Sequence, residues 1–374
     1  MLEKCKWFNN YQTPCCLMID DLAPVAISRT GEIGAFNDWG YLMNTPESLY
    51  AYMDRWLLKR YPEIRGTIFL PLESHNYIPL NMGYKIIKRD IDDSFINFLK
   101  FLQDRFEFAF HGINHCGDEE DDDGKIIHEY TNPDMDCLDY SVAKVGLFNE
   151  KNGIAFLGGK FPGYSYNDYA LLLIEKLGCK WWALDANMIN RRNRDNNIKY
   201  SQDKSYICIP TNTSGDLFRK SPSLSILRNV KRKLKNSFYL KPEKYIQYLY
   251  ESRLPITIQE HYQNQRTDGK RQTPNLYDDI KYLDDLFGYL RRLDIWFANC
   301  SDIAHYYDSY NNTRIKVTEN KIIIDYEGMW DRPYISMIGD KPTIISLEDN
   351  QQISGCKKGN YWIFNELGTG EYYI

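Results

Sequence analysis

Short apolar runs that alternate with amphipathic stretches predict a repeating strand–helix order over most of the chain. Cys15 to Ile19 is an apolar run of the length of a buried strand, and Pro46 to Arg60 follows with apolar residues at helical spacing. Gly66 to Pro71 then predicts a second strand, and Ile91 to Phe106 a second helix. Strands that alternate with helices in this way are typical of a parallel sheet covered by helices.

The same order continues to about residue 312. Further strands are predicted where apolar runs end at polar or glycine residues, and further helices lie between them. The expected strands are Phe108 to Phe110, Ile154 to Leu157, Lys180 to Leu184, Leu254 to Gln259 and Ile295 to Ala298, and the expected helices are Asp168 to Leu177, Pro242 to Ser252 and Tyr277 to Leu293. We therefore expect one α/β domain over residues 1–312.

Two stretches depart from this pattern. Residues 186–240 are rich in Asn and Arg and predict an insertion, which contains the basic stretch Arg228 to Lys235. This stretch could make a peripheral contact with an anionic surface, but a solvated helix is the simpler interpretation because the whole chain is acidic. Residues 313–374 alternate short strands with turns and predict a small antiparallel β domain.

Composition places the chain among ordinary globular proteins. Its 374 residues, 43% of them hydrophobic and 26% charged, suffice for one large domain and a small one. The net charge of -5 argues against a nucleic-acid binder, which needs a basic surface. No signal-like segment and no run long enough to span a bilayer is visible, so we expect a cytoplasmic protein. Nine cysteines without a CxxC pair are expected to be thiols.

Polar residues that can carry chemistry gather at the ends of the predicted strands. They are Asp20 and Asp21, His111 and His115, Lys160, Asp185 and His261. The two histidines after the strand at Phe108 are four residues apart, and on a helical turn this spacing aims both imidazoles at one metal ion. Because the carboxyl ends of parallel strands lie on one rim of a barrel, all these residues are expected to converge on one pocket.

In their order along the chain these motifs resemble the polysaccharide deacetylases with a NodB-type catalytic domain, as in carbohydrate esterase family 4. The matching segments, all within roughly Cys15 to Tyr307, are Ile19-Asp20-Asp21, His111-Gly-Ile-Asn-His115, Lys160-Phe-Pro-Gly-Tyr164, Leu184-Asp185 and Ile258-Gln-Glu-His261. The resemblance implies a distorted (β/α) barrel and hydrolysis of an N-acetyl or related acyl group. It also implies a divalent metal, usually zinc, held by Asp21, His111 and His115.

The chemistry of these residue types supports the same division of roles. One aspartate and two histidines leave a tetrahedral metal one open position for water, which is the mark of a catalytic site. Asp20, next to the ligand Asp21, would be the general base. His261 would reach in from the opposite side of the pocket as the general acid, and the resemblance implies that Asp185 orients it.

The third motif departs from the family pattern. The family usually has arginine where Lys160 stands, so lysine would hold the base carboxylate by charge without a planar fork. Pro162, Gly163 and Tyr164 would form the substrate and oxyanion contact, with a backbone N–H that glycine allows to approach closely. Gly163 and Tyr164 stand in the reverse of the usual order, and Gly112 replaces the usual hydroxyl residue after the first histidine.

Three functions remain open from the sequence. The first is removal of an acetyl group from an amino sugar or polysaccharide. The second uses the same site on a non-sugar amide, a cyclic ureide or an O-acetyl ester, since a polarised carbonyl serves all three. The third is a barrel that binds a glycan without catalysis, which the lysine at position 160 motivates. His75, His128 and His305 lack a matching context and are expected to be ordinary histidines.

Overall fold

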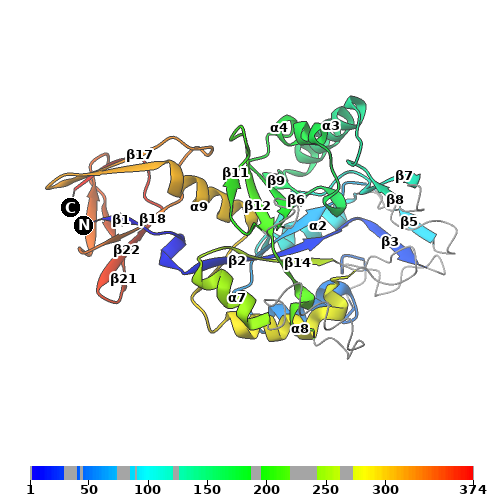
Figure 1. Ribbon diagram of the computed structural model, residues 1–374, viewed down its shortest axis with the longest axis horizontal. Helices are drawn as coiled ribbons and strands as arrows, with labels where there is room; N and C mark the ends of the chain where they lie inside the picture. The colour runs from blue at the N-terminus through cyan, green and yellow to red at the C-terminus, as the bar shows by residue number, and fades with distance from the viewer. Residues whose placement is uncertain are drawn as a thin grey trace.

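A largely parallel sheet flanked by helices makes up the greater part of the molecule, and a smaller all-β unit lies at one end of its long axis (Figure 1). The computed structural model describes residues 2–28, 40–42, 45–73, 85–88, 91–120, 126–186, 195–219, 242–261 and 273–373. The basic stretch Arg228 to Lys235 and His75 lie outside these residues. None of the helices in the described ranges is long and apolar enough to cross a membrane.

The central sheet has the strand order β11-β12-β10-β9-β6-β4-β2-β14-β13, and β15 also pairs with β2. All of these pairings are parallel except that of β11 with β12. The strands are β2 (Thr13–Asp20), β4 (Gly66–Leu70), β6 (Phe106–Phe110), β9 (Gly158–Gly159), β10 (Trp181–Asp185), β11 (Lys199–Tyr200), β12 (Ile207–Thr211), β13 (Thr213–Ser214), β14 (Ile256–His261) and β15 (Ile295–Phe297).

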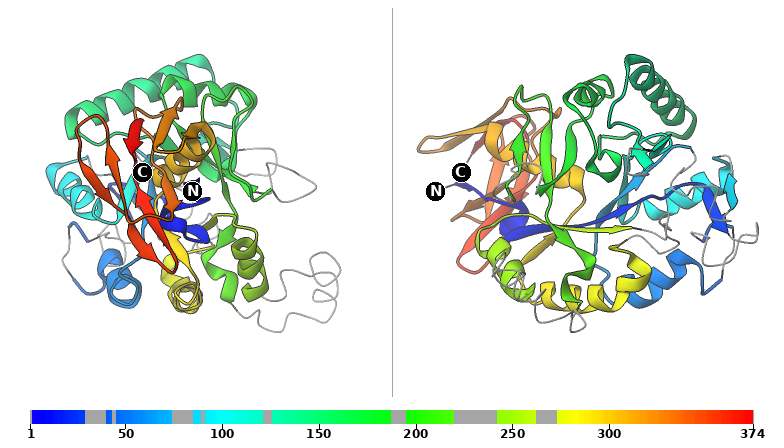
Figure 2. Two further views of the ribbon diagram at one scale, coloured as in Figure 1. Left: turned by 90° about the vertical axis from the view of Figure 1, so that its left-hand side faces the viewer. Right: turned by 45° about the vertical axis from the view of Figure 1, so that its right-hand side comes forward.

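Helices cover the outer side of this sheet (Figure 2). They are α1 (Leu49–Met53) with η3 (Asp54–Leu58), α2 (Asp93–Leu102), α3 (Met135–Asn152), η6 (Asp168–Leu171) with α4 (Leu172–Lys176), η7 (Gly215–Phe218), α7 (Pro242–Glu251) and α8 (Leu276–Leu290). Helix α9 (Cys300–Asn312) packs instead in the other layer, toward the β unit. Alternate residues of β2 enter different apolar layers, as the twofold period of a strand requires. Leu17 packs in the layer with the outer helices, whereas Met18 packs in the layer that α9 and the β unit close.

The central sheet curls but does not close into a hydrogen-bonded barrel. β12 and β13 follow one another in the chain yet pair with opposite ends of the sheet, β10 and β14. Asn212 lies between them, and its side chain accepts from Thr257 N at 3.1 Å and donates to Pro255 O at 2.8 Å. The predicted distorted barrel is therefore confirmed only in part, as a parallel α/β sheet whose ends are joined by side-chain hydrogen bonds. Residues 186–240 were predicted to be an insertion, but they include β12, which pairs with β10 as a strand of the central sheet.

The small β unit consists of two sheets, β1-β18-β22-β21 and β16-β17-β23-β19-β20. Its strands are β1 (Glu3–Lys4), β16 (Thr313–Val317), β17 (Lys321–Tyr326), β18 (Ser336–Gly339), β19 (Thr343–Ser346), β20 (Gln352–Ser354), β21 (Cys356–Lys358), β22 (Tyr361–Asn365) and β23 (Gly370–Tyr373). Because β1 pairs with β18, the first residues of the chain also belong to this unit. The predicted β domain at residues 313–374 does not include them. The two chain ends accordingly lie close together (Figure 1).

The structure also differs from the sequence prediction at β9 and α3. No strand forms at Ile154 to Leu157, and the strand of the sheet is β9, the two residues that follow. Helix α3 was not predicted, because its buried apolar residues are too few to make a clear helical stripe. Its ends did carry signals, since the Asp134 side chain accepts from the Cys137 N–H and Gly153 ends the helix with a φ of 66°. Two separate ladders complete the structure, β3 (Val25–Ser28) with β5 (Lys85–Lys88) and β7 (Cys116–Glu120) with β8 (Ile126–His128).

Candidate active site

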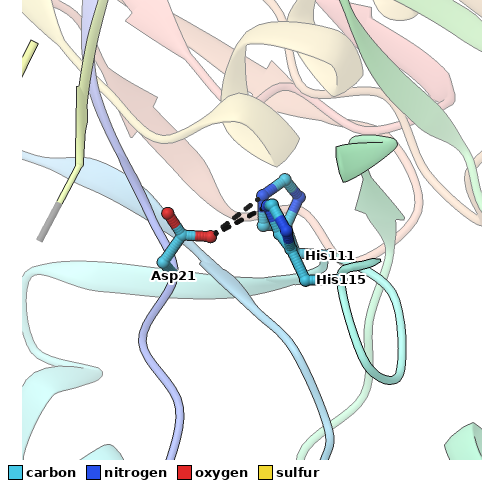
Figure 3. A group of neighbouring side chains, drawn as sticks. All are labelled: Asp21, His111 and His115. Carbon is cyan, nitrogen blue, oxygen red and sulfur yellow. Dashed lines mark ion pairs between the residues drawn. The ribbon is translucent and has the colours of Figure 1, made fainter. Parts of the chain in front are cut away.

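Asp21, His111 and His115 meet just beyond the carboxyl ends of β2 and β6. One carboxylate oxygen of Asp21 lies 3.5 Å from His111 Nε2 and 3.3 Å from His115 Nε2 (Figure 3). All three side chains are buried, and one donor atom from each lies within 4.8 Å of the others. Two imidazoles and one carboxylate that face a common point fit a divalent ion such as zinc, and they leave part of its coordination sphere open.

Two residues of this group, Asp21 and His115, have left-handed backbone conformations. Neighbouring residues of a strand point to opposite faces, but β2 ends at Asp20, and the φ of 73° at Asp21 lets both carboxylates reach the same site. Gly112 and His115 have φ values of 86° and 66°. The histidine pair therefore lies in an irregular turn, and the helical turn predicted from its spacing was wrong. Such backbone strain in non-glycine residues concentrates at functional sites.

A main-chain carbonyl orients His111. Its Nδ1 atom lies 2.9 Å from Lys160 O. A carbonyl oxygen can only accept, so Nδ1 carries the proton and the lone pair of Nε2 faces the metal position. A hydrogen bond of this kind behind a ligating imidazole fixes both its tautomer and its ring orientation.

Glu129 supports the turn from outside and was not singled out in the sequence. Its Oε2 atom accepts hydrogen bonds from the backbone N–H groups of residues 113, 114 and 115, at 3.0, 3.1 and 3.2 Å. Burial raises the pKa of this carboxyl to about 7, although the three N–H groups oppose the rise. Glu129 follows β8, and the ladder of β8 with β7 brings the chain back to the turn at residues 111–115. A glutamate fifteen or so residues downstream matches no motif, so no sequence signal identified it.

His128 also lies beside the site, although the sequence left it as an ordinary histidine. Its ring meets that of His115 edge-on, with centroids 5.5 Å apart. It also packs against one side of Gly163, where a Cβ would lie 2.2 Å from His128 Nε2, so the close approach requires glycine. His305, by contrast, stacks on Trp330 with centroids 4.7 Å apart, next to the small β unit.

Asp20 lies beside the metal group. Its Oδ1 atom is 2.5 Å from Lys160 Nζ, and its Oδ2 atom is 3.5 Å from His261 Nε2 and 4.0 Å from His111 Nε2. In the parallel pairing of β14 with β2, His261 is directly opposite Asp20, which explains why the two side chains are neighbours. His261 was expected on the opposite side of the pocket from the base, and it adjoins the base instead.

Lys160 is completely buried and forms an ion pair with Asp20. Its ammonium group also lies 4.1 Å from the centre of the Phe69 ring. A buried charge is costly unless it is paired, so the pairing holds both partners in place. Lysine does supply charge to the Asp20 carboxylate, as predicted, but only to one of its two oxygens.

Gln259 supplies a hydrogen bond to the second oxygen. Its Nε2 atom donates to Asp20 Oδ2 at 3.1 Å. The Tyr164 hydroxyl donates to Gln259 Oε1 at 2.9 Å, which fixes the orientation of the amide. Burial, and next the charge of Asp20, raise the pKa of Tyr164 well above its usual value, so the hydroxyl remains a donor. Gln259 stands within the fifth motif, but the sequence did not assign it a role.

The Nδ1 atom of His261 lies 2.9 Å from Pro274 O, so a main-chain carbonyl orients this imidazole too. Neutral His261 then carries its proton on Nδ1, and Nε2 faces Asp20 and Gln259. Asp185 ends β10 opposite Thr211 of β12. The orienting role that the resemblance gave to Asp185 stays a prediction.

The segment expected to hold the oxyanion is the turn η5 (Pro162–Tyr164), where Gly163 has a φ of 58°. Proline has no N–H, and the Tyr164 N–H donates to Phe161 O at 3.0 Å. Gly163 itself is exposed, whereas Pro162 is buried. Gly163 is therefore the residue of this turn whose main chain a ligand can approach.

Comparison with known proteins adds distant likenesses in fold. No protein-family model matches the sequence, and no curated protein matches it significantly. A proposed polysaccharide deacetylase from Mycobacterium smegmatis matches with a TM-score of 0.45 at 11% identity, over 84% of this chain and 97% of that one. A GH57-type branching enzyme from Pyrococcus horikoshii gives 0.46 at 10% identity, over 78% and 70%. A CE4 family pseudoenzyme from Bacillus anthracis gives 0.36 at 12% identity, over 79% and 66%. Likenesses this distant assign no activity to the chain.

Proposed function

We propose that the protein is a metal-dependent hydrolase that removes an acetyl or related acyl group from an amino sugar or polysaccharide. The observation that carries the proposal is the convergence of Asp21, His111 and His115 on one point, with the acid–base pair Asp20 and His261 directly beside it. A divalent ion held by the three ligands would polarise the acyl carbonyl and lower the pKa of water.

The residues around that group would move the protons of the hydrolysis. Asp20 would accept the proton of the attacking water at its carboxylate, which Lys160 and Gln259 hold in place. The Gly163 N–H would donate to the oxyanion that forms at the carbonyl carbon. His261, once protonated at Nε2, would give this proton to the nitrogen as the C–N bond breaks. Water thus adds across the bond and leaves a free amine and a carboxylic acid, which releases its proton to solvent.

The side-by-side arrangement of Asp20 and His261 supports a direct relay between them. With 3.5 Å between Oδ2 and Nε2, the proton taken from water can reach the imidazole without crossing the pocket. The tautomer set by Pro274 O leaves Nε2 ready to receive it. One site can therefore serve as both base and acid in a single turnover.

The test is acyl release by the full chain loaded with zinc, measured on N-acetylated oligosaccharides, O-acetylated sugars, a cyclic ureide and a simple acetamide. We expect acetate from the N-acetylated sugars, and loss of at least about a thousandfold in the His111→Ala variant, because the ion is then lost. Protein stripped of metal by a chelator should lose and regain activity with zinc. Full activity of the stripped protein would contradict the proposal, and release only from the other compounds would change the substrate class.

A further inference from the structure

The turn that carries both histidines has no regular secondary structure. Its carbonyls at 112 and 113 accept from the N–H groups of Leu72 and Glu73 at 3.1 and 2.8 Å, and a single carboxylate oxygen accepts its three consecutive N–H groups. Glu129 Oε2 accepts from three successive N–H groups, those of residues 113, 114 and 115. Consecutive N–H groups that converge in this way form a concave anion site. Hydrogen bonds to an ionised acceptor are stronger than those between neutral groups. The last of the three N–H groups belongs to His115 itself.

Gly112 makes room for this carboxylate. A Cβ atom at position 112 would lie 2.7 Å from Glu129 Oε2, closer than a real Cβ contact allows. The φ of 86° at Gly112 also favours glycine over other residues. Glu129 can therefore reach the N–H groups of the turn only because residue 112 is glycine.

The main chain adds a second link at the same place. The Glu129 N–H donates to His115 O at 3.3 Å, so Glu129 contacts His115 through both its own amide and its carboxylate. In the β7–β8 ladder Cys116 pairs with His128, and the His128 ring packs against the ring of His115. The second metal ligand is thus held by the two residues that end this hairpin.

We propose that Glu129 is a positioning residue that fixes the backbone of the 111–115 turn and thereby sets His115 for metal binding. Glu129 does not belong to the ligand group and acts through main-chain N–H groups. The inference rests on the proposed function only in taking Asp21, His111 and His115 as a metal site. Removal of the carboxylate leaves three N–H groups, that of His115 among them, without this acceptor, which is costly for the conformation they share. The backbone bonds to the carbonyls of residues 112 and 113 remain, so the loosening is expected to be greatest at His115.

The experiment measures zinc affinity of the full chain by competition with a chromophoric chelator. Glu129→Ala is expected to bind zinc about 10- to 100-fold more weakly than the unaltered protein, as for other groups behind metal ligands. Glu129→Gln keeps an oxygen acceptor but loses the charge, so a several-fold loss is expected. Amide proton resonances of residues 113–115 in the metal-free protein should move upfield in Glu129→Ala, because their hydrogen bonds are lost.

Glu107→Ala is the matched control. Glu107 is another glutamate whose carboxylate accepts a backbone N–H, that of Ser301, but it lies at the far end of β6. This variant should lower the melting temperature and leave zinc affinity unchanged. Zinc affinity of Glu129→Ala equal to that of the unaltered protein, or an equal loss in Glu107→Ala, would overturn the inference.

The two proposals fail in different ways. If the unaltered protein binds no zinc, the proposed function fails, and the three amide resonances still decide whether Glu129 fixes the turn: unmoved resonances overturn that role. If Glu129→Ala does not fold, Glu129→Gln decides instead, and unchanged zinc affinity together with unmoved resonances overturns it.

Discussion

Two glutamates lie near the two ends of β6 and differ in what they hold. Glu107 belongs to the strand itself, whereas Glu129 follows β8 and contacts the turn at residues 111–115 that comes after β6. At its amino end Glu107 accepts from the Thr67 hydroxyl at 2.6 Å and from the Ser301 N–H at 2.9 Å. At its carboxyl end Glu129 accepts from the three N–H groups of this turn. Burial raises the pKa of both carboxyls to about 7.

The difference lies in what the donors belong to. Thr67 is part of β4 and Ser301 lies in the first turn of α9, so Glu107 ties together elements that are regular without it. Its carboxylate also lies at the positive end of the α9 dipole, where a negative charge is favourable. The donors of Glu129 belong to a turn with no ladder or helix of its own. We therefore expect the carboxylate of Glu107 to stabilise the fold at the amino end of the strand, and that of Glu129 to shape the proposed metal site at the carboxyl end. Substitutions at the carboxyl end should change chemistry, and those at the amino end should change only stability.

The largest effect is expected for Asp20→Asn, on the site side of this comparison. The amide keeps the shape of the side chain but cannot take a proton from water, so kcat should fall by about 10²- to 10⁴-fold. Zinc content should stay unchanged, because Asp20 is not among the three ligands. Steady-state kinetics with metal analysis check both points.

The matched control for this variant is Asp308→Asn. Asp308 is equally buried, but it lies in α9 and accepts from Tyr200 and Asn312 at the junction with the β unit. Its substitution should lower the free energy of unfolding and spare kcat. A fall in kcat of less than tenfold in Asp20→Asn, or a loss of its zinc, would show that the base has been misassigned.

A smaller effect is expected for Gln259→Leu, which removes the hydrogen bond to Asp20 Oδ2 but leaves the Lys160 ion pair. A hydrogen bond to a charged group contributes about 1.5 kcal/mol, so kcat should fall about tenfold with little change in KM. Tyr164→Phe should have part of the same effect, because it frees the amide of Gln259. The double variant should be no slower than Gln259→Leu alone, since both act on one contact. Additive losses would mean that Tyr164 also acts outside this contact, either on the substrate or through Lys160, whose Nζ donates to the Tyr164 hydroxyl at 3.5 Å.

The sequence predicted those parts of the site that follow directly from strand ends. Asp20, His111 and His261 stand where apolar runs stop, and parallel strands bring such ends to one rim, so their convergence could be expected without coordinates. The candidate metal group of Asp21, His111 and His115 was predicted instead from the spacing of the two histidines and from the family resemblance.

The partners that orient these residues could not be predicted in this way. Glu129 and the Pro274 carbonyl act through main-chain groups in turns, and any residue type can offer a carbonyl. The closure of the sheet escaped prediction for a similar reason. Between β12 and β14, side-chain hydrogen bonds of Asn212 stand in place of a backbone ladder. One asparagine among the many in residues 186–240 gives no sequence signal for such a role. Local patterns thus specify which residues meet, while loop geometry specifies how each is held.

Glu107→Gln is expected to have no effect on kcat. It should instead change how the free energy of unfolding depends on pH. Burial raises the pKa of Glu107 from 4.5 to about 7, so between these values the folded protein binds a proton that the unfolded chain has released. Stability from this group is therefore present at low pH and is lost as pH rises toward 7. Between about pH 5 and pH 8 the unaltered protein should lose about 1–3 kcal/mol more unfolding free energy than the glutamine variant.

Urea unfolding of both proteins at several pH values measures this difference. Glu129 titrates in both proteins, so its contribution cancels. Parallel curves for the two proteins would show that Glu107 is ionised throughout, and the contrast between the two ends of β6 would then rest on geometry alone.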